Sequence, residues 1–92
     1  NMHEVELTDT FGGQANYCWS SRHTVYMPQL TEYGYTGSSD GSYSKANRAY
    51  ERELMRKAKA KVGLTGIRGR KEHWGDTIVF YPYGMNVVMF IV

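Results

Sequence analysis

Ten of the eleven basic residues in this chain lie within 28 consecutive positions, and they are the strongest chemical signal in the sequence. Residues 44–71 carry ten bases and two acids, a net charge of +8, whereas residues 1–43 carry −4 and residues 72–92 carry −2. Guanidinium and ammonium groups at this density create a positive field that attracts phosphates and carboxylates and speeds their capture. The charge distribution therefore predicts an acidic partner, either a nucleic acid or an acidic protein surface.

The spacing of these bases predicts that most of them share one face of a helix over residues 44–62. At 100° per residue, the apolar side chains fall on one arc and the bases fall opposite. Ser44 is placed to cap the first turn and Gly63 to end the helix. The apolar arc comprises Tyr43, Ala46, Tyr50, Leu54, Ala58 and Val62. The basic face comprises Lys45, Arg48, Arg52, Arg56 and Lys59.

A second basic segment follows the helix directly. Residues 63–71 contain three glycines, with Arg68, Arg70 and Lys71 among them. Backbone amides in glycine-rich turns can hold phosphates, but this segment matches neither a nucleotide-binding loop nor a dinucleotide-binding fingerprint. The segment extends the positive surface beyond the helix, and its residues fit a simple connection as well as they fit a contact site.

Aromatic residues complete the predicted contact surface. Tyr33 and Tyr35 lie in a long loop, residues 28–44, that contains three glycines and no sustained apolar period. Trp74 lies next to the basic segment. Flat amphipathic rings stack on nucleobases or anchor protein interfaces, so we expect these three side chains to contact a partner. Trp19 shares the strand parity of apolar residues, and we expect it in the core.

Nothing in the sequence selects a catalytic, metal or cofactor site. The three histidines are too scattered for the spacing of common zinc sites, and Cys18 has no second cysteine to pair with. On an extended strand, Cys18 and His23 would lie on opposite faces, which argues against a nucleophile and base. We therefore expect a protein without enzymatic activity, bound metal or cofactor.

The elements that must position these side chains fit one small domain, residues 1–92, because 92 residues are too few to divide. Alternating and apolar runs predict strands over residues 3–10, 17–27, 77–83 and 87–92. Residues 64–71 read as an extended or turning segment with room for a short strand. The order ββαββ predicts an α+β two-layer sandwich in which one helix covers a four-stranded, mainly antiparallel sheet.

The sequence also predicts the compartment. Small secreted domains usually contain several disulfides, whereas this chain has the single cysteine Cys18. The first residues lack the pattern of a signal peptide. The longest strongly apolar run, residues 87–92, is six residues against the ~20 that a spanning helix needs. We expect a cytoplasmic protein that does not enter a membrane.

Three strings in the chain resemble small uncharacterised proteins of phages and prophages. They are Asp9-Thr-Phe-Gly-Gly-Gln-Ala-Asn-Tyr17 with Trp19, Lys57-Ala-Lys-Ala-Lys-Val-Gly-Leu-Thr-Gly-Ile-Arg-Gly-Arg70, and Phe80-Tyr-Pro-Tyr-Gly84. The resemblance covers most of the chain and implies a phage accessory role in a bacterial host. Proteins of this size in that setting are often inhibitors of host defence, anti-CRISPR proteins among them, which act by occupying a surface.

Together these observations predict a non-enzymatic phage-type protein that inhibits a host defence protein or nucleoprotein complex. The bases would contact guide RNA or an acidic protein surface, and the aromatic side chains would serve as anchors. One alternative is a small nucleic-acid-binding domain, such as a phage regulator, that uses the same basic face. Another is a virion or assembly component that oligomerises through edge strands. The sequence leaves the partner and the oligomeric state open.

Overall fold

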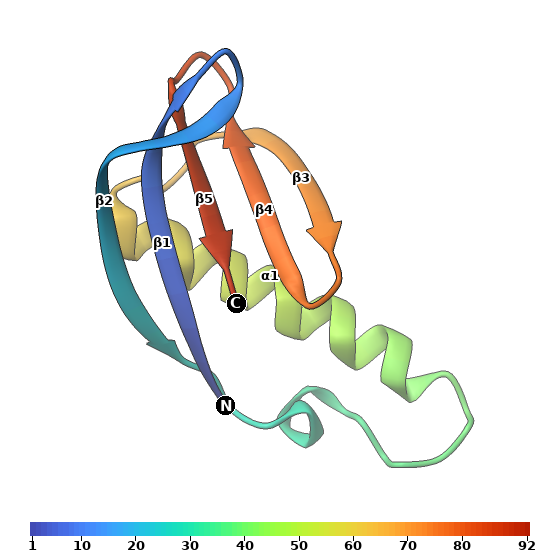
Figure 1. Ribbon diagram of the computed structural model, residues 1–92. Helices are drawn as coiled ribbons and strands as arrows, with labels where there is room; N and C mark the ends of the chain where they lie inside the picture. The colour runs from blue at the N-terminus through green and yellow to red at the C-terminus, as the bar shows by residue number, and fades with distance from the viewer.

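The computed structural model describes residues 1–92 and shows one antiparallel sheet with a long helix across one of its faces (Figure 1). The sheet has five strands in the order β2-β1-β5-β4-β3. The last strand of the chain therefore pairs with the first and joins the N-terminal hairpin to the C-terminal one. The elements are β1 (Met2–Phe11), β2 (Gln14–Tyr26), the 3-10 turn η1 (Leu30–Tyr33), α1 (Ser42–Val62), β3 (Gly69–Trp74), β4 (Thr77–Pro82) and β5 (Val87–Ile91).

The predicted α+β class is confirmed, but the prediction of four strands is wrong. The fifth strand is β3, which pairs with β4 from Gly69 opposite Pro82 to Trp74 opposite Thr77. Its sequence, GRKEHW, has no apolar alternation because β3 is an edge strand with no buried residue. Charged side chains on an edge strand also discourage pairing with another chain.

Helix α1 begins two residues before the predicted cap. The backbone N–H of Ser42 donates to the Asp40 carboxylate at 3.0 Å, and this hydrogen bond holds the pKa of Asp40 below its ordinary value. Gly41 precedes the helix with φ 85°, so Ser44 lies inside the first turn. The C-terminal prediction is confirmed, because Gly63 ends α1 with φ 79°. Neither α1 nor η1 combines the length and apolar character of a membrane-crossing helix.

The core lies between α1 and the sheet face behind the strands in Figure 1. α1 approaches β2 and β1 most closely and keeps a greater distance from β3 and β4. A helix with its side chains is ~10 Å wide, whereas five strands spaced ~4.8 Å apart span ~19 Å. One helix thus leaves part of this face uncovered beside β3. The buried core residues are Val5, Val25, Met27, Leu54, Ala58, Leu64, Ile78, Phe80, Met89 and Ile91.

A large bulge interrupts the pairing of β1 with β2. Between the pairs Thr8–Ser20 and Thr10–Ala15, four residues of β2 face the single residue Asp9. The Asp9 carboxylate accepts the side-chain amide of Asn16 at 3.0 Å and the backbone N–H of Cys18 at 2.9 Å, contacts that lower its pKa. Trp19 lies in this bulge and is 47% exposed. The prediction of Trp19 in the core is wrong, because strand parity no longer decides burial where the pairing is broken.

Packing of α1 on the sheet can be tested at Leu54, which is 2% exposed. We expect Leu54→Ala to lower the free energy of unfolding by about 2–5 kcal/mol, because it opens a cavity between helix and sheet. The exposed substitution Arg52→Ala, half a turn away and similar in helix propensity, should change it by less than about 0.5 kcal/mol. Urea denaturation followed by circular dichroism measures both, and equal effects would contradict this packing.

Candidate functional site

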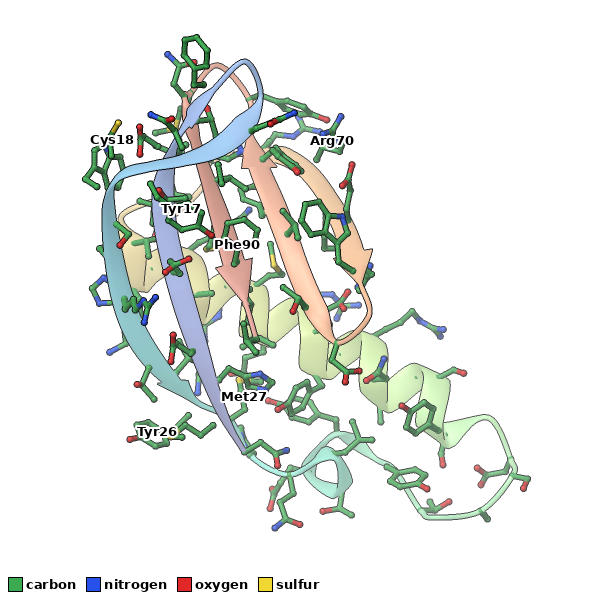
Figure 2. All side chains as sticks on the ribbon, in the orientation of Figure 1. Tyr17, Cys18, Tyr26, Met27, Arg70 and Phe90 are labelled. Carbon is green, nitrogen blue, oxygen red and sulfur yellow. The ribbon has the colours of Figure 1, made fainter.

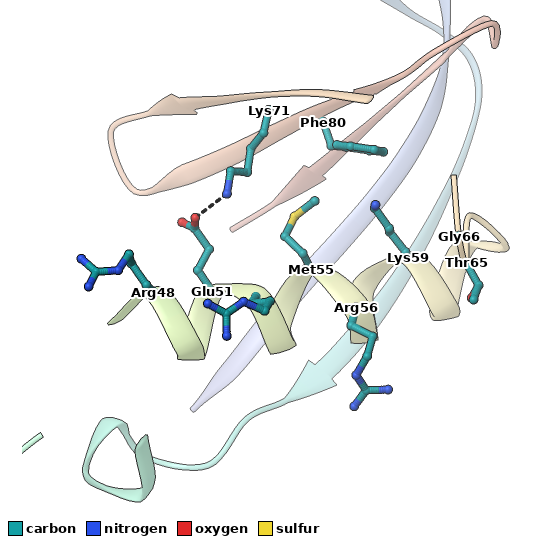
Figure 3. Close-up of a pocket in the computed structure, with 10 residues that line it drawn as sticks. Arg48, Glu51, Met55, Arg56, Lys59, Thr65, Gly66, Lys71 and Phe80 are labelled. Atoms are coloured by element: carbon teal, nitrogen blue, oxygen red, sulfur yellow. Dashed lines mark hydrogen bonds and ion pairs between the residues drawn. The ribbon is translucent and has the colours of Figure 1, made fainter. Parts of the chain in front are cut away.

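A groove with a volume of about 580 Å³ lies between the basic side of α1 and the strands β3 and β4 (Figure 3). We call it the basic groove. It contains five basic side chains and one acidic side chain, a net charge of +4. The lining residues are Arg48, Glu51, Arg52, Met55, Arg56, Lys59, Thr65, Gly66, Lys71 and Phe80.

The apolar floor of the groove is formed by Phe80, which is buried, and by Met55. Gly69 lets the Phe80 ring lie directly beneath the start of β3, since a Cβ atom there would come within 2.7 Å of the ring. The Lys59 ammonium lies 4.5 Å from the centroid of this ring and donates to the Ile67 carbonyl at 2.8 Å. The ring and the carbonyl hold the Lys59 ammonium in place without neutralising its charge.

Glu51 ties α1 to the edge strand. Its carboxylate accepts hydrogen bonds from Lys71 Nζ at 2.7 Å, drawn in Figure 3, and from His73 Nε2 at 2.6 Å. Burial raises the pKa of Glu51, but the hydrogen bonds from Lys71 and His73 outweigh burial and hold the pKa below its ordinary value. The carboxylate therefore stays ionised and fixes β3 against the helix.

Most of the positive charge in the groove is free to meet a ligand. Arg48 and Arg52 form no ion pair, and the hydrogen-bond acceptor of Lys59 is a neutral carbonyl. Arg56 pairs with Glu53 at 3.3 Å, but its side chain is 68% exposed, and such surface pairs are weak. Figure 3 shows Arg56 pointing away from the sheet and Arg48 extending along the helix direction, while Lys59 reaches toward Phe80.

The structure brings together five of the eight predicted basic contacts, namely those in the groove lining. Lys45 and Arg68 are exposed but lie outside that lining. Arg70 lies on the opposite face of the sheet, because neighbouring residues of a strand point to opposite sides and Lys71 points to α1. There the Arg70 guanidinium lies 4.5 Å above the Tyr81 ring and pairs with Glu72 at 3.3 Å.

The three predicted aromatic contacts do not form one surface with the groove. Tyr33 is half-buried: its ring packs edge-on against Tyr50, and its hydroxyl donates to Glu53, which raises the pKa of Tyr33 to about 12. Tyr35 packs edge-on against Tyr43 with ring centroids 5.6 Å apart. Trp74 is 54% exposed and lies on the sheet face opposite the groove. Tyr33 thus fastens the loop to α1.

Sequence reasoning missed Glu51 and Phe80, two residues that shape the groove. The sequence did distinguish Glu51, because it is one of only two acids among the ten bases of residues 44–71. The inward parity of Phe80 on its strand indicated burial but could not indicate that Lys59 lies over its ring. That contact depends on how far α1 lies from β4, which no local pattern specifies.

The chemistry available in the groove is anion binding. Guanidinium forks and ammonium groups donate charge-assisted hydrogen bonds to phosphate or carboxylate oxygens. No group of three His, Cys, Asp or Glu side chains is placed to hold a metal ion. No family model, curated protein or solved structure matches the chain. The interpretation of the groove therefore rests on its own geometry and charge.

The Tyr33 contact predicts a pH-dependent effect on stability. Its hydrogen bond is the main reason why the pKa of Glu53 lies below the ordinary value of 4.5. A lowered folded-state pKa stabilises the fold above the unfolded pKa, and this stabilisation is lost as the pH falls through the folded value. We expect Tyr33→Phe to lower the melting temperature at pH 7, with a smaller difference at pH 3.

Thermal unfolding followed by circular dichroism measures this effect. Tyr43→Phe is the matched control, because the Tyr43 hydroxyl makes no hydrogen bond and is exposed. The melting temperature of the control should match that of the wild type at both pH values. If Tyr33→Phe lowers the melting temperature as much at pH 3 as at pH 7, the role given to Glu53 is contradicted.

Proposed function

We propose that the chain is a non-enzymatic binding protein that holds a nucleic-acid phosphate backbone in the basic groove. The observation that carries this proposal is the lining of the groove, where five bases surround a single acid. That acid, Glu51, already has two partners within the protein, so it offers little repulsion to an incoming anion.

The arrangement of the arginines favours a polymer of phosphates over a single anion. Arg48, Arg52 and Arg56 follow one another at intervals of four residues, a rise of ~6 Å each along α1. Such a row offers successive contacts to an extended polyanion, whereas a single small anion could use only part of it. Each contact releases counterions, so affinity should fall steeply with salt.

The groove is suited to the backbone of a nucleic acid and not to reading its bases. Sequence is read by side chains that reach base edges, whereas arginine and lysine contacts to phosphates fix position. Phe80 is buried on the floor, so its ring is not free to stack on a base. We therefore expect binding that is largely independent of sequence.

The biological role that we propose is inhibition of a host defence nucleoprotein complex. In this role the basic groove binds the guide RNA or another nucleic acid of that complex. This role follows from the resemblance of three strings of the chain to small phage and prophage proteins and from the net charge of +4 in the groove, which suits the phosphates of a bound RNA. Phage-type inhibitors of this kind act in the cytoplasm of the bacterial host.

A second candidate is a regulator that binds free nucleic acid. It is favoured by the packing of Tyr33 and Tyr35 against Tyr50 and Tyr43, which leaves fewer aromatic anchors for a protein partner. A pull-down from bacterial lysate with and without nuclease separates the two candidates. A defined assembly that survives nuclease supports the inhibitor, whereas nucleic acid alone, lost on nuclease treatment, supports the regulator.

Substitution of the unpaired arginines tests the groove directly. We expect Arg48→Gln with Arg52→Gln to weaken binding of a fluorescein-labelled single-stranded RNA about tenfold or more in an anisotropy titration. The slope of log affinity against log salt should fall in magnitude by about 1.4, since each lost phosphate contact removes about 0.7 for a single strand.

The control is Lys45→Gln with Lys61→Gln, which removes the same charge from the same helix outside the groove lining. It should retain most of the affinity and of the salt slope. Equal losses for the two pairs would show that net charge alone drives binding, and the groove assignment would then fail.

A further inference from the structure

The sheet face opposite α1 carries a second hollow, lined mainly by aromatic rings. This face points toward the viewer in Figures 1 and 2, and Figure 2 shows Tyr17 and Phe90 over the strands. The hollow has a volume of about 520 Å³, within the range of ligand sites. We call it the aromatic hollow, and its lining residues are Gly13, Gln14, Ala15, Tyr17, Trp74, Tyr81, Val88 and Phe90.

Four strands contribute the rings, and the rings themselves cover this face. Val79 and Val88 point to this side and are at most 1% exposed, although no helix lies above them. Tyr17 has φ 56°, a left-handed conformation made possible by the bulge at Asp9. Trp74 lies beside Phe90 with ring centroids 6.2 Å apart. The rings form a half-exposed layer, and the hollow lies between them and Gly13, Gln14 and Ala15 of the β1–β2 hairpin.

The charge of this face is opposite to that of the groove. Strand alternation places three acids and two bases here, a net charge of −1 against +4 in the basic groove. Both bases are already paired, Arg22 with Glu6 at 2.9 Å and Arg70 with Glu72 at 3.3 Å. The acids are Glu4, Glu6 and Glu72. Two of the three acids are neutralised in these pairs, so one negative charge remains in excess on this face, which favours a cation over a polyanion.

The rings are also electronically suited to a cation. The Trp74 indole N–H donates to the Glu72 carboxylate at 3.0 Å, which increases the electron density of the ring. Burial and the neighbouring Glu6 carboxylate both raise the pKa of the Tyr17 hydroxyl. The Arg70 guanidinium, 4.5 Å above Tyr81, shows that a ring of this face accepts a planar cation.

We propose that the aromatic hollow docks an arginine side chain from a basic segment of a partner protein. A guanidinium is planar and weakly hydrated, stacks on aromatic faces and forms paired hydrogen bonds with carboxylates. Tyrosine, tryptophan and arginine are the residues that dominate protein interfaces energetically. This second site goes beyond the proposed function because it lies on the opposite face of the sheet. The two sites are compatible with one partner, since a nucleoprotein assembly presents both phosphates and basic protein surfaces.

The test uses a blocked tri-arginine peptide as the probe and a blocked tri-glutamine peptide as its uncharged counterpart, each titrated into the full chain by calorimetry. We expect tri-arginine to bind measurably tighter. Trp74→Leu should weaken that binding about three- to tenfold, as the loss of one cation–π contact implies. Trp19→Leu is the matched control, since Trp19 has similar exposure outside the hollow, and it should leave binding unchanged.

Equal binding of the two peptides, or equal losses in the two tryptophan variants, would overturn the proposal. Self-association of the wild type that Trp74→Leu abolishes would also overturn it, because a second copy would then occupy the face. If Trp74→Leu does not fold, Glu72→Gln provides the same test by removing a rim carboxylate. Two further measurements separate this proposal from the proposed function. Trp74→Leu should leave the affinity for RNA unchanged, and Arg48→Gln with Arg52→Gln should leave the binding of tri-arginine unchanged.

Discussion

A single helix cannot cover a five-stranded sheet, and the surfaces of this protein follow from that constraint. Helix α1 packs closely over β1 and β2, where its apolar side meets Val5 and Val25. Beside β3 and β4 the helix leaves a gap, and four bases of its basic face line that gap together with Lys71 as the basic groove. The opposite face has no helix at all, so aromatic side chains cover its valines. Both candidate binding surfaces are thus consequences of how little of the sheet α1 covers.

Edge strand β3 divides the two surfaces electrostatically. Lys71 points toward α1, where Glu51 holds it against the groove, whereas Arg70 and Glu72 point to the aromatic face. Because neighbouring side chains of this six-residue strand point to opposite faces, Lys71 adds positive charge to the groove side. On the other side, the ion pair of Arg70 with Glu72 leaves the edge of the sheet nearly neutral. The strand does this without an apolar residue facing the core. Its position depends on pairing with β4 and on the close approach of Gly69 to Phe80. It depends also on the hydrogen bonds that Glu51 of α1 accepts from β3.

The parts of the fold that the sequence predicted are those with a local period. The helix was recognisable from the apolar arc that includes Leu54 and Ala58, and four strands were recognisable from alternating or continuous apolar runs. β3 was not, because an edge strand exposed on both faces needs no alternation. Trp19 was misplaced because a bulge closed by Asp9 is a tertiary feature of two strands. The basic side of the groove followed from charge spacing, whereas Glu51, Phe80 and the separation of Arg70 from Lys71 required the strand pairing.

The central claim is that a phosphate backbone lies in the groove between α1 and β3, and nuclear magnetic resonance tests it most directly. A single-stranded RNA of arbitrary sequence is titrated at low salt while backbone amides and arginine Nε–H signals are followed. The account predicts that the largest shifts fall at Arg48, Arg52, Lys59 and Lys71, and that added salt reverses them. Shifts concentrated at Trp74 and Phe90, or spread evenly over all bases including Arg22, would contradict it.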